Sequence, residues 1–250
     1  TAPRFKKAVK FHMVQENLSV LDKFKLLKDL GFDGVESHMR YVQLKEFIAA
    51  SEATGLPIHG VTNSADPDIK TAVDTIRACG GTSVLVVAGR VTKENSYEDN
   101  YDAMLKRYRE AAPYAEQQGI RLLVENVWNN FLLSPLEMAR FIDEIENPAM
   151  GVYFDVGNVV RYGWPDQWIR VLGERIVKLD IKEYSRKLQV EQGERQGFHV
   201  EIGEGDCDWP RVRAALKEIG YSGWATAEVR GGDRKRLADI AARMDRVLDI

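Results

Sequence analysis

The sequence predicts a single (β/α)₈ barrel that spans residues 1–250. Three observations favour this fold. A chain of 250 residues has about the typical length of one such barrel, short β-rich segments alternate with helical ones, and no linker or low-complexity stretch divides the chain. A doubly wound open sheet is the rival, but it usually has about five or six strands and a glycine-rich first turn. Neither GxGxxG nor GxxxxGK[ST] occurs here, so the barrel is preferred.

Eight segments are predicted to form the parallel strands of the barrel, because strand and helix alternate along the whole chain. In chain order they are Val9–Val14, Gly34–His38, Leu56–Asn63, Ser83–Gly89, Arg121–Val127, Gly151–Gly157, Ile176–Glu183 and Gly223–Arg230.

The helices are predicted from apolar residues at helical spacing and from capping signals. The first carries Leu18, Leu21, Phe24, Leu27 and Leu30, and Gly31 ends it. Ser134-Pro135-Leu136-Glu137 combines an N-cap, a first-turn proline and a capping-box glutamate. Further helices follow Asp208 and Pro210, ending at Gly220, and run from about Asp233 to the C-terminus. Residues 184–208 are predicted to be a long irregular loop, typical of a lid or a substrate wall.

Composition excludes several classes of function. The net charge of −3 gives no reason to expect a nucleic-acid partner, and no apolar run approaches the roughly 18 residues that cross a bilayer. Cys79 and Cys207 are too few for a disulfide framework or a thiolate metal site. We expect a cytoplasmic protein without a membrane partner. Because the chain begins at Thr1, a removed leader is the alternative, and homo-oligomerisation stays open.

Alternate residues of a strand share a face, which predicts the side chains that point into the barrel. In the last strand Ala225 and Ala227 suit helix packing, which leaves Thr226, Glu228 and Arg230 inside. The same reasoning turns the following polar residues inward: His12, Glu36, His38, His59, Glu125, Asp155, Lys178, Asp180 and Lys182.

Four of these acids, Glu125, Asp155, Asp180 and Glu228, converge near the C-terminal ends of their strands, where barrel active sites lie. An unpaired buried carboxylate costs several kcal/mol or takes up a proton. Lys182 and Arg230 offset part of the charge, and a bound divalent cation is the simplest remedy for the rest. A single acid such as Glu36 or Asp180 is equally well explained by a structural salt bridge, and His12 and His59 by a satisfied core histidine.

Four motifs, spread over nearly the whole chain in the right order, resemble the xylose-isomerase-like TIM-barrel superfamily and its sugar phosphate isomerase/epimerase branch. They are Gly31-Phe32-Asp33-Gly34-Val35-Glu36, Leu122-Leu123-Val124-Glu125-Asn126, Tyr153-Phe154-Asp155-Val156-Gly157-Asn158 and Gly203-Glu204-Gly205-Asp206-Cys207-Asp208-Trp209. The resemblance implies one divalent metal, held by Glu125, Asp155, Glu228 and a residue of the seventh strand.

The position in the seventh strand departs from the family pattern. The family's usual His-x-Lys-Asp/Glu stands here as Asp180-Ile181-Lys182-Glu183. If Asp180 ligates through oxygen, the site is all-carboxylate and favours Mn²⁺ or Mg²⁺ over Co²⁺ or Zn²⁺. Otherwise His199 from the long loop, or a water, completes the shell.

The resemblance implies an isomerase or epimerase of a ketose or keto-sugar derivative, which abstracts a proton next to a carbonyl through a metal-stabilised enediolate. Glu125 and Glu228 would then be both ligands and the acid/base pair. Lys182, His59 and Arg230 are candidates for proton transfer or hydroxyl contacts, and Asn126 and Asn158 for orienting ligands or substrate. The remaining predicted substrate contacts are His12, Glu36, His38 and His199.

Several alternatives stay open. A lyase acting on a keto-sugar, an inosose or a 3-keto-glycoside uses the same enediolate, and the family's ketose 3-epimerases carry an extra glutamate where this chain reads Trp128-Asn129-Asn130-Phe131. Four histidines and the negative charge argue against an endonuclease IV-like DNA repair enzyme, and a non-catalytic sugar-binding barrel would need a purely structural acid cluster. Gly231-Gly232 could form a phosphate cup, but Asp233 beside it favours a substrate without phosphate.

Overall fold

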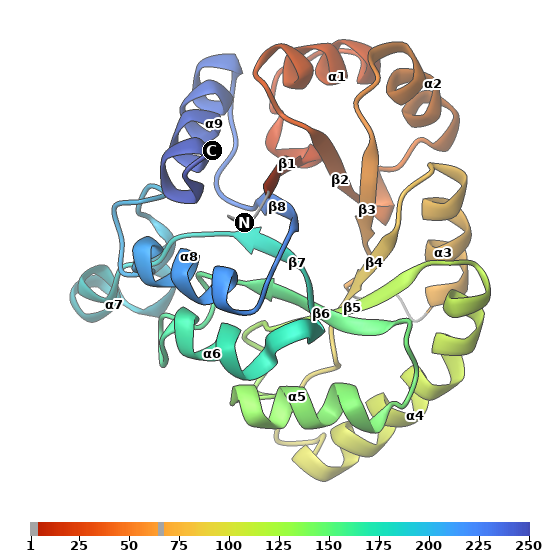
Figure 1. The fold of residues 1–250 in the computed structure, drawn as a ribbon, viewed down its shortest axis with the longest axis vertical. Coiled ribbons are helices and arrows are strands. Elements are labelled where there is room, and N and C mark those ends of the chain that lie inside the picture. The colour runs from red at the N-terminus through yellow and green to blue at the C-terminus, as the bar shows by residue number, and fades with distance from the viewer. Residues whose placement is uncertain (1–4, 65–67) are drawn as a thin grey trace.

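The structure is a computed structural model that describes residues 5–64 and 68–250. Within these residues, parallel strands β1 to β8 close into a barrel in chain order. Figure 1 shows the strands at the centre with the helices around them, which is the arrangement of a (β/α)₈ barrel. The predicted fold class is confirmed, and among the described residues no helix has the length and apolar character that crossing a membrane requires.

The strands are β1 (Phe5–Lys10), β2 (Gly34–His38), β3 (Ile58–Thr62), β4 (Ser83–Val86), β5 (Arg121–Glu125), β6 (Met150–Asp155), β7 (Ile176–Ile181) and β8 (Gly223–Ala227). The helices are α1 (Val20–Asp29), α2 (Leu44–Thr54), α3 (Ile69–Ala78), α4 (Tyr97–Gln117), α5 (Pro135–Glu144), α6 (Pro165–Leu172), α7 (Arg186–Gln192), α8 (Trp209–Glu218) and α9 (Arg234–Leu248). Short 3₁₀ helices are η1 (Phe11–Met13), η2 (Met39–Tyr41), η3 (Gly173–Arg175) and η4 (Glu194–Phe198).

The first strand is the main correction to the predicted boundaries. We expected Val9–Val14, whereas β1 runs from Phe5 to Lys10 and the chain then turns through η1. The lysines of β1 interrupt its apolar pattern, although residues 5–9 pair with β8. Val14 returns to the sheet through an isolated bridge to Gly232. The other strands overlap their predicted ranges, and most of them end one to three residues earlier.

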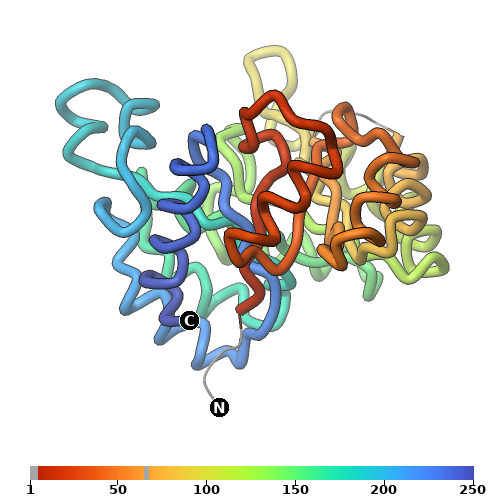
Figure 2. The backbone as a smooth tube through the Cα atoms, turned by 90° about the horizontal axis from the view of Figure 1, so that it is seen from above, coloured from red at the N-terminus to blue at the C-terminus, as the bar shows by residue number. Residues whose placement is uncertain are grey.

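The segment after β7 is also more regular than predicted. Residues 184–208 contain α7 and η4 rather than an uninterrupted loop. Ser185 begins α7 by accepting a hydrogen bond from the amide of Leu188. Figure 2 shows this segment, in teal, standing out at the upper left of the molecule.

The predicted helix signals mostly hold. Gly31 follows α1 in the left-handed region, at φ 78°, which a residue without a Cβ adopts without strain. Ser134 caps α5 by accepting from the amide of Glu137, and Pro135 occupies the first turn. Glu137 does not complete the expected capping box, because its carboxylate accepts from the amide of Leu133 and from the hydroxyl of Tyr97.

Apolar residues between the strands and the helices form the main core. Members from the strands include Val35, Val61, Val84, Leu122, Phe154, Leu179 and Ala225. The opposite faces of the same strands fill the barrel interior, where Leu85, Leu123 and Tyr153 form a small apolar cluster. The rest of the interior is polar, and this polar column leads to the site.

Candidate active site

Four carboxylates meet at the C-terminal ends of the last four strands. Glu125 ends β5, Asp155 ends β6, Asp180 lies near the end of β7, and Glu228 follows β8. Each offers one oxygen, and these oxygens lie within 4.8 Å of one another. Parallel pairing explains the convergence, since Asp155 is directly opposite Asp180 in the register of β6 and β7.

Two buried lysines lie among these acids. Lys182 Nζ is 2.7 Å from Asp155 Oδ2 and 2.7 Å from Glu228 Oε2. Lys10 Nζ is 2.9 Å from Asp180 Oδ1 and also forms an ion pair with Glu36. Two ammonium groups therefore face the four acids and Glu36, so the lysines compensate only part of the negative charge.

Some of the carboxylate oxygens are buried without a hydrogen bond. Asp180 Oδ2 and Glu36 Oε1 accept none from any described residue, although both side chains are fully buried. A buried acceptor without a partner loses the hydration it had in water and gains nothing in exchange. A cation held by the four-acid cluster would remove that penalty for Asp180, whereas Glu36 lies outside the cluster.

The pKa values of the acids differ with their surroundings. Burial raises the pKa of Glu125, Asp155 and Asp180, and repulsion from neighbouring carboxylates adds to the rise. Burial also acts to raise the pKa of Glu228, but attraction to Lys182 and Lys10 outweighs it and lowers that pKa to about 2. Without further positive charge, the cluster therefore resists full ionisation.

The donor set fits a divalent cation. Four carboxylate groups from four strands supply hard oxygen ligands at one point, which suits Mg²⁺ or Mn²⁺ better than metals that prefer nitrogen or sulfur. Glu125, Asp155, Asp180 and Glu228 would hold the ion, with Lys10 and Lys182 beside them.

A cavity of about 520 Å³ opens above the acids. It is lined by Arg90, Glu125, Val127, Trp128, Asn158, Lys182, Arg195, Phe198, His199, Glu228, Val229 and Arg230. Its volume falls within the usual range of small-molecule sites. η4 supplies one wall, so the segment after β7 does form part of the cavity.

Aromatic and amide side chains shape this cavity. The ring of Trp128 lies 4.9 Å from that of Phe198, and its Nε1 donates to the carbonyl of Asn158 at 2.8 Å. Asn158 Nδ2 lies 3.4 Å from Glu125 Oε1 and donates to the carbonyl of Asn126 at 2.9 Å. Gly157 allows the chain after β6 to lie close to Lys182, because a Cβ there would lie 2.9 Å from the carbonyl carbon of Lys182.

The other residues expected at the site lie in different surroundings. Asn126 is buried, and its amide exchanges hydrogen bonds with the backbone of Asp155. His59 lies deep in the barrel, stacked on Trp224 with ring centroids 4.3 Å apart. His12 is exposed in η1, and half-buried His38 accepts a hydrogen bond from the amide of Arg40. None of these four lines the cavity described above.

The inward positions connect into one polar column. Lys178 Nζ lies 3.0 Å from His59 Nδ1, and Thr226 Oγ1 lies 3.1 Å from His59 Nε2. Thr226 in turn accepts from the hydroxyl of Tyr153, which lies 3.2 Å from Glu36 Oε2. Gly60 leaves room for that carboxylate, because a Cβ there would lie 2.7 Å from Glu36 Oε1.

The motif at residues 203–209 has a structural basis that the sequence did not reveal. Buried Glu183 accepts hydrogen bonds from the amides of Gly203 and Cys207 and from Trp209 Nε1. The carboxylate therefore ties the start of α8 to the end of β7. Gly205 allows the approach, since a Cβ there would lie 2.6 Å from Glu183 Oε1.

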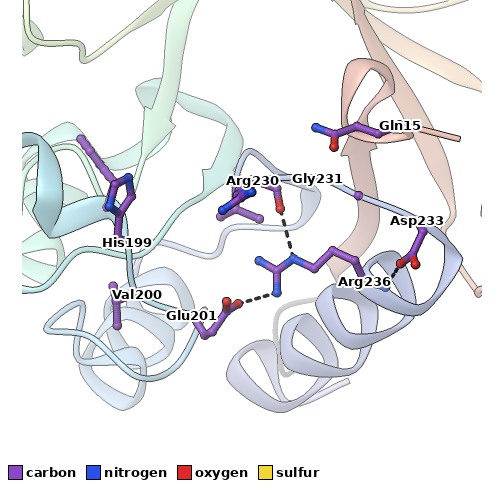
Figure 3. A pocket seen from close by; sticks show the side chains of 11 residues that line it. Gln15, His199, Val200, Glu201, Arg230, Gly231, Asp233 and Arg236 are labelled. Atoms are coloured by element: carbon purple, nitrogen blue, oxygen red, sulfur yellow. Dashed lines mark hydrogen bonds and ion pairs between the residues drawn. The ribbon is translucent and has the colours of Figure 1, made fainter.

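A second cavity, of about 810 Å³, adjoins the first and shares His199 and Arg230 with it. Figure 3 shows Arg230 between His199 on one side and Gln15 on the other, with Arg236 directed toward Glu201. Gly231 and Gly232, considered above as a possible phosphate cup, line this second cavity. Gly231 packs closely against the backbone of η1, because a Cβ would lie 2.1 Å from the carbonyl oxygen of Met13.

Comparison with known proteins places the fold in a family. The family model described as xylose isomerase-like TIM barrel matches residues 24–248. The chain belongs to the xylose isomerase-like TIM-barrel family. The motifs that suggested this relationship therefore identified the superfamily correctly, and the four acids lie at the end of the barrel where TIM-barrel enzymes in general carry their active sites.

Individual relatives within this family are distant. The 2-oxo-tetronate isomerase of Pectobacterium atrosepticum is 26% identical over 90% of this chain and 91% of its own. An uncharacterized protein of Methanocaldococcus jannaschii is 28% identical, but the match covers only 48% of this chain and 40% of that protein.

Two solved structures resemble the whole barrel. The match to D-allulose 3-epimerase from Methylomonas sp. has a TM-score of 0.77 at 19% identity. It covers 98% of this chain and 97% of that chain. The match to the 3-keto-D-glucoside 4-epimerase of E. coli has a TM-score of 0.81 at 16% identity. It covers 99% of this chain and 100% of that chain. At these identities the resemblance shows the fold alone.

Residues that the sequence reasoning missed include Lys10, Arg90 and Arg195. Lys10 lies within the predicted first strand at the same parity as His12, so the two-residue repeat could have identified it as an inward residue. Arg90 and Arg195 reach the cavity from a loop after β4 and from η4. No periodicity marks such positions, because only the folded loops bring them there.

Proposed function

We propose that this barrel is a divalent-metal-dependent isomerase or epimerase of a ketose or keto-sugar derivative. The observation that carries the proposal is the meeting of four carboxylates, with buried oxygens that accept no hydrogen bond, at the floor of a cavity of ligand size. The names of the relatives support the substrate class, since they are a 2-oxo-tetronate isomerase, a D-allulose 3-epimerase and a 3-keto-D-glucoside 4-epimerase.

The cation would polarise the substrate carbonyl and stabilise the negative charge that develops when the neighbouring C–H proton leaves. Glu125 and Glu228 both line the cavity, so one carboxylate can take the proton while the other returns it. Lys182 holds Glu228 in place through its 2.7 Å contact and can share in the proton transfer.

The walls of the cavity bind and orient the substrate. Asn158 contacts Glu125 and keeps that carboxylate directed toward the cavity. Trp128 and Phe198 supply an apolar wall that excludes water from the reacting atoms. His199 and Arg230 lie where substrate hydroxyl groups would be within reach.

The test is incubation with Mn²⁺ and a panel of ketoses, inososes and 3-keto-glycosides in D₂O. Deuterium in the recovered or isomerised sugar is the expected result, because the abstracted proton exchanges with solvent. Release of water or of a glycosidic fragment would instead identify a lyase. No turnover together with no Mn²⁺ retained after dialysis would contradict the proposal and favour a non-catalytic barrel.

Two substitutions test the assigned roles. Glu125→Gln and Glu228→Gln each preserve side-chain volume but remove a ligand and a base, so each should reduce turnover by at least roughly 100-fold, the size expected for general acid–base catalysis. Asp206→Asn is the matched control, since this carboxylate lies outside the cavity and accepts a hydrogen bond from the amide of Arg186. Near-normal turnover in either glutamate variant would remove it from the mechanism.

A further inference from the structure

The upper part of the site cavity carries an excess of arginine. Arg90, Arg195 and Arg230 line it from three separate parts of the chain: the loop after β4, η4 and the segment after β8. The acidic residues that line the same cavity are Glu125 and Glu228, which belong to the acid cluster at its floor. The rim and the floor therefore differ in charge.

The rim arginines are also available to a ligand. The guanidinium groups of Arg195 and Arg230 make no ion pair and no hydrogen bond to any described side chain or backbone atom. The guanidinium group of Arg90 makes a single hydrogen bond, of 3.4 Å, to the carbonyl of Trp128. By contrast, Arg161 at the back of Trp128 is paired with Glu194 at 2.7 Å.

The neighbouring larger cavity shares the unpaired Arg230 but differs in its other charged residues. Its Arg236 is paired with Glu201 at 2.6 Å and with Asp239 at 3.3 Å, and Asp233 also lines the wall. An anion placed there would meet carboxylates and an arginine whose charge is already compensated. The smaller cavity above the acid cluster is therefore the better place for negative charge on a ligand.

We propose that the substrate is an anionic keto-sugar, whose carboxylate or phosphate group is bound by Arg195, Arg230 and Arg90 while its carbonyl end reaches the acid cluster. This proposal rests on the function proposed above and names its substrate class. A guanidinium group matches the geometry of carboxylate and phosphate oxygens and donates two parallel hydrogen bonds to either. The two ends of such a substrate would meet the two ends of the cavity, which fixes its orientation.

Binding of unreactive probes tests the proposal without turnover. D-gluconate, glucitol and glucitol 6-phosphate share six carbons and lack a ketone, and only the first and third are anionic. By calorimetry, with and without Mn²⁺, at least one anionic probe should bind roughly 10- to 100-fold more tightly than glucitol, as expected for charge-assisted hydrogen bonds. A preference for gluconate assigns a carboxylate, and a preference for glucitol 6-phosphate assigns a phosphate.

Substitutions decide whether the arginines cause the preference. Arg230→Gln and Arg195→Gln should each reduce the anion-to-glucitol affinity ratio by about tenfold, because each removes a charged donor. Arg234→Gln is the matched control, since Arg234 lies four residues away, pairs with Asp29 and lines neither cavity. Equal binding of all three probes, or a preference that survives both substitutions, would overturn the proposal.

Failure of this inference differs from failure of the function. Proton exchange on neutral ketoses without any preference for anions would overturn the anionic substrate and leave the isomerase intact. Arginine-dependent binding of an anionic probe without turnover of any sugar would support the anion site and contradict the isomerase.

Discussion

Replacing Lys10 by methionine probes the charge balance of the barrel interior. The Lys10 side chain is 3% exposed, and its two partners, Glu36 and Asp180, are fully buried. Attraction to Asp180 and Glu36 outweighs the effect of burial and raises the pKa of Lys10, so the residue is charged in the folded protein. Methionine is one atom shorter than lysine and fills most of the same space, but it leaves both carboxylates without their cation.

The expected cost is large. Removing one partner of a buried ion pair typically destabilises a protein by about 3–5 kcal/mol, because the other charge stays buried without compensation. For a domain of this size, 1 kcal/mol corresponds to roughly 2–4 °C in Tm, which gives a fall of about 6–20 °C. Urea unfolding and circular dichroism of the EDTA-treated protein measure both quantities.

Lys7→Met is the matched control on the same strand. Lys7 is 7% exposed, but its partner Asp245 is 42% exposed and can be rehydrated, so the loss should stay near about 1 kcal/mol. Mn²⁺ should restore more stability to Lys10→Met than to the wild type, because the ion supplies the missing positive charge. Equal losses in the two lysine variants would refute this account of the interior.

Two further predictions concern the same polar column. Asp180→Asn should weaken Mn²⁺ binding at least about tenfold in calorimetry, and unchanged affinity in this variant would show that Asp180 is not a ligand. Asp180→His should shift the metal preference from Mg²⁺ toward Zn²⁺, because an imidazole nitrogen suits zinc. Burial lowers the pKa of Lys178 to about 7, whereas an unfolded lysine titrates near about 10.4. Between these two pKa values the unfolded chain binds more protons than the folded protein. The free energy of unfolding of the EDTA-treated protein should therefore rise by up to about 1.4 kcal/mol per pH unit. Lys178→Met should remove that rise. Parallel pH profiles of unfolding for wild type and variant would contradict the assignment.

Local signals in the sequence were sufficient for much of the fold. The alternation of strands and helices predicted the barrel, and capping residues such as Ser134 and Gly31 marked helix ends, because both depend on neighbours within a few residues. The first strand was misplaced for the same reason. Its lysines interrupt the local apolar pattern, and only the folded structure shows that Lys7 packs outward against α9 while Lys10 points into the barrel.

The sequence by itself determined which side chains could enter the barrel. The two-residue repeat of a strand brings Glu125, Asp155, Asp180 and Glu228 inward, and parallel pairing gathers them at one end. Only the tertiary structure decided their partners. Lys10 on β1 reaches Asp180 on β7 past the intervening strand β8, and Arg195 and Arg230 reach the rim from separate segments. Such contacts depend on the closure of the barrel and on the paths of its loops, which no repeat in the sequence encodes.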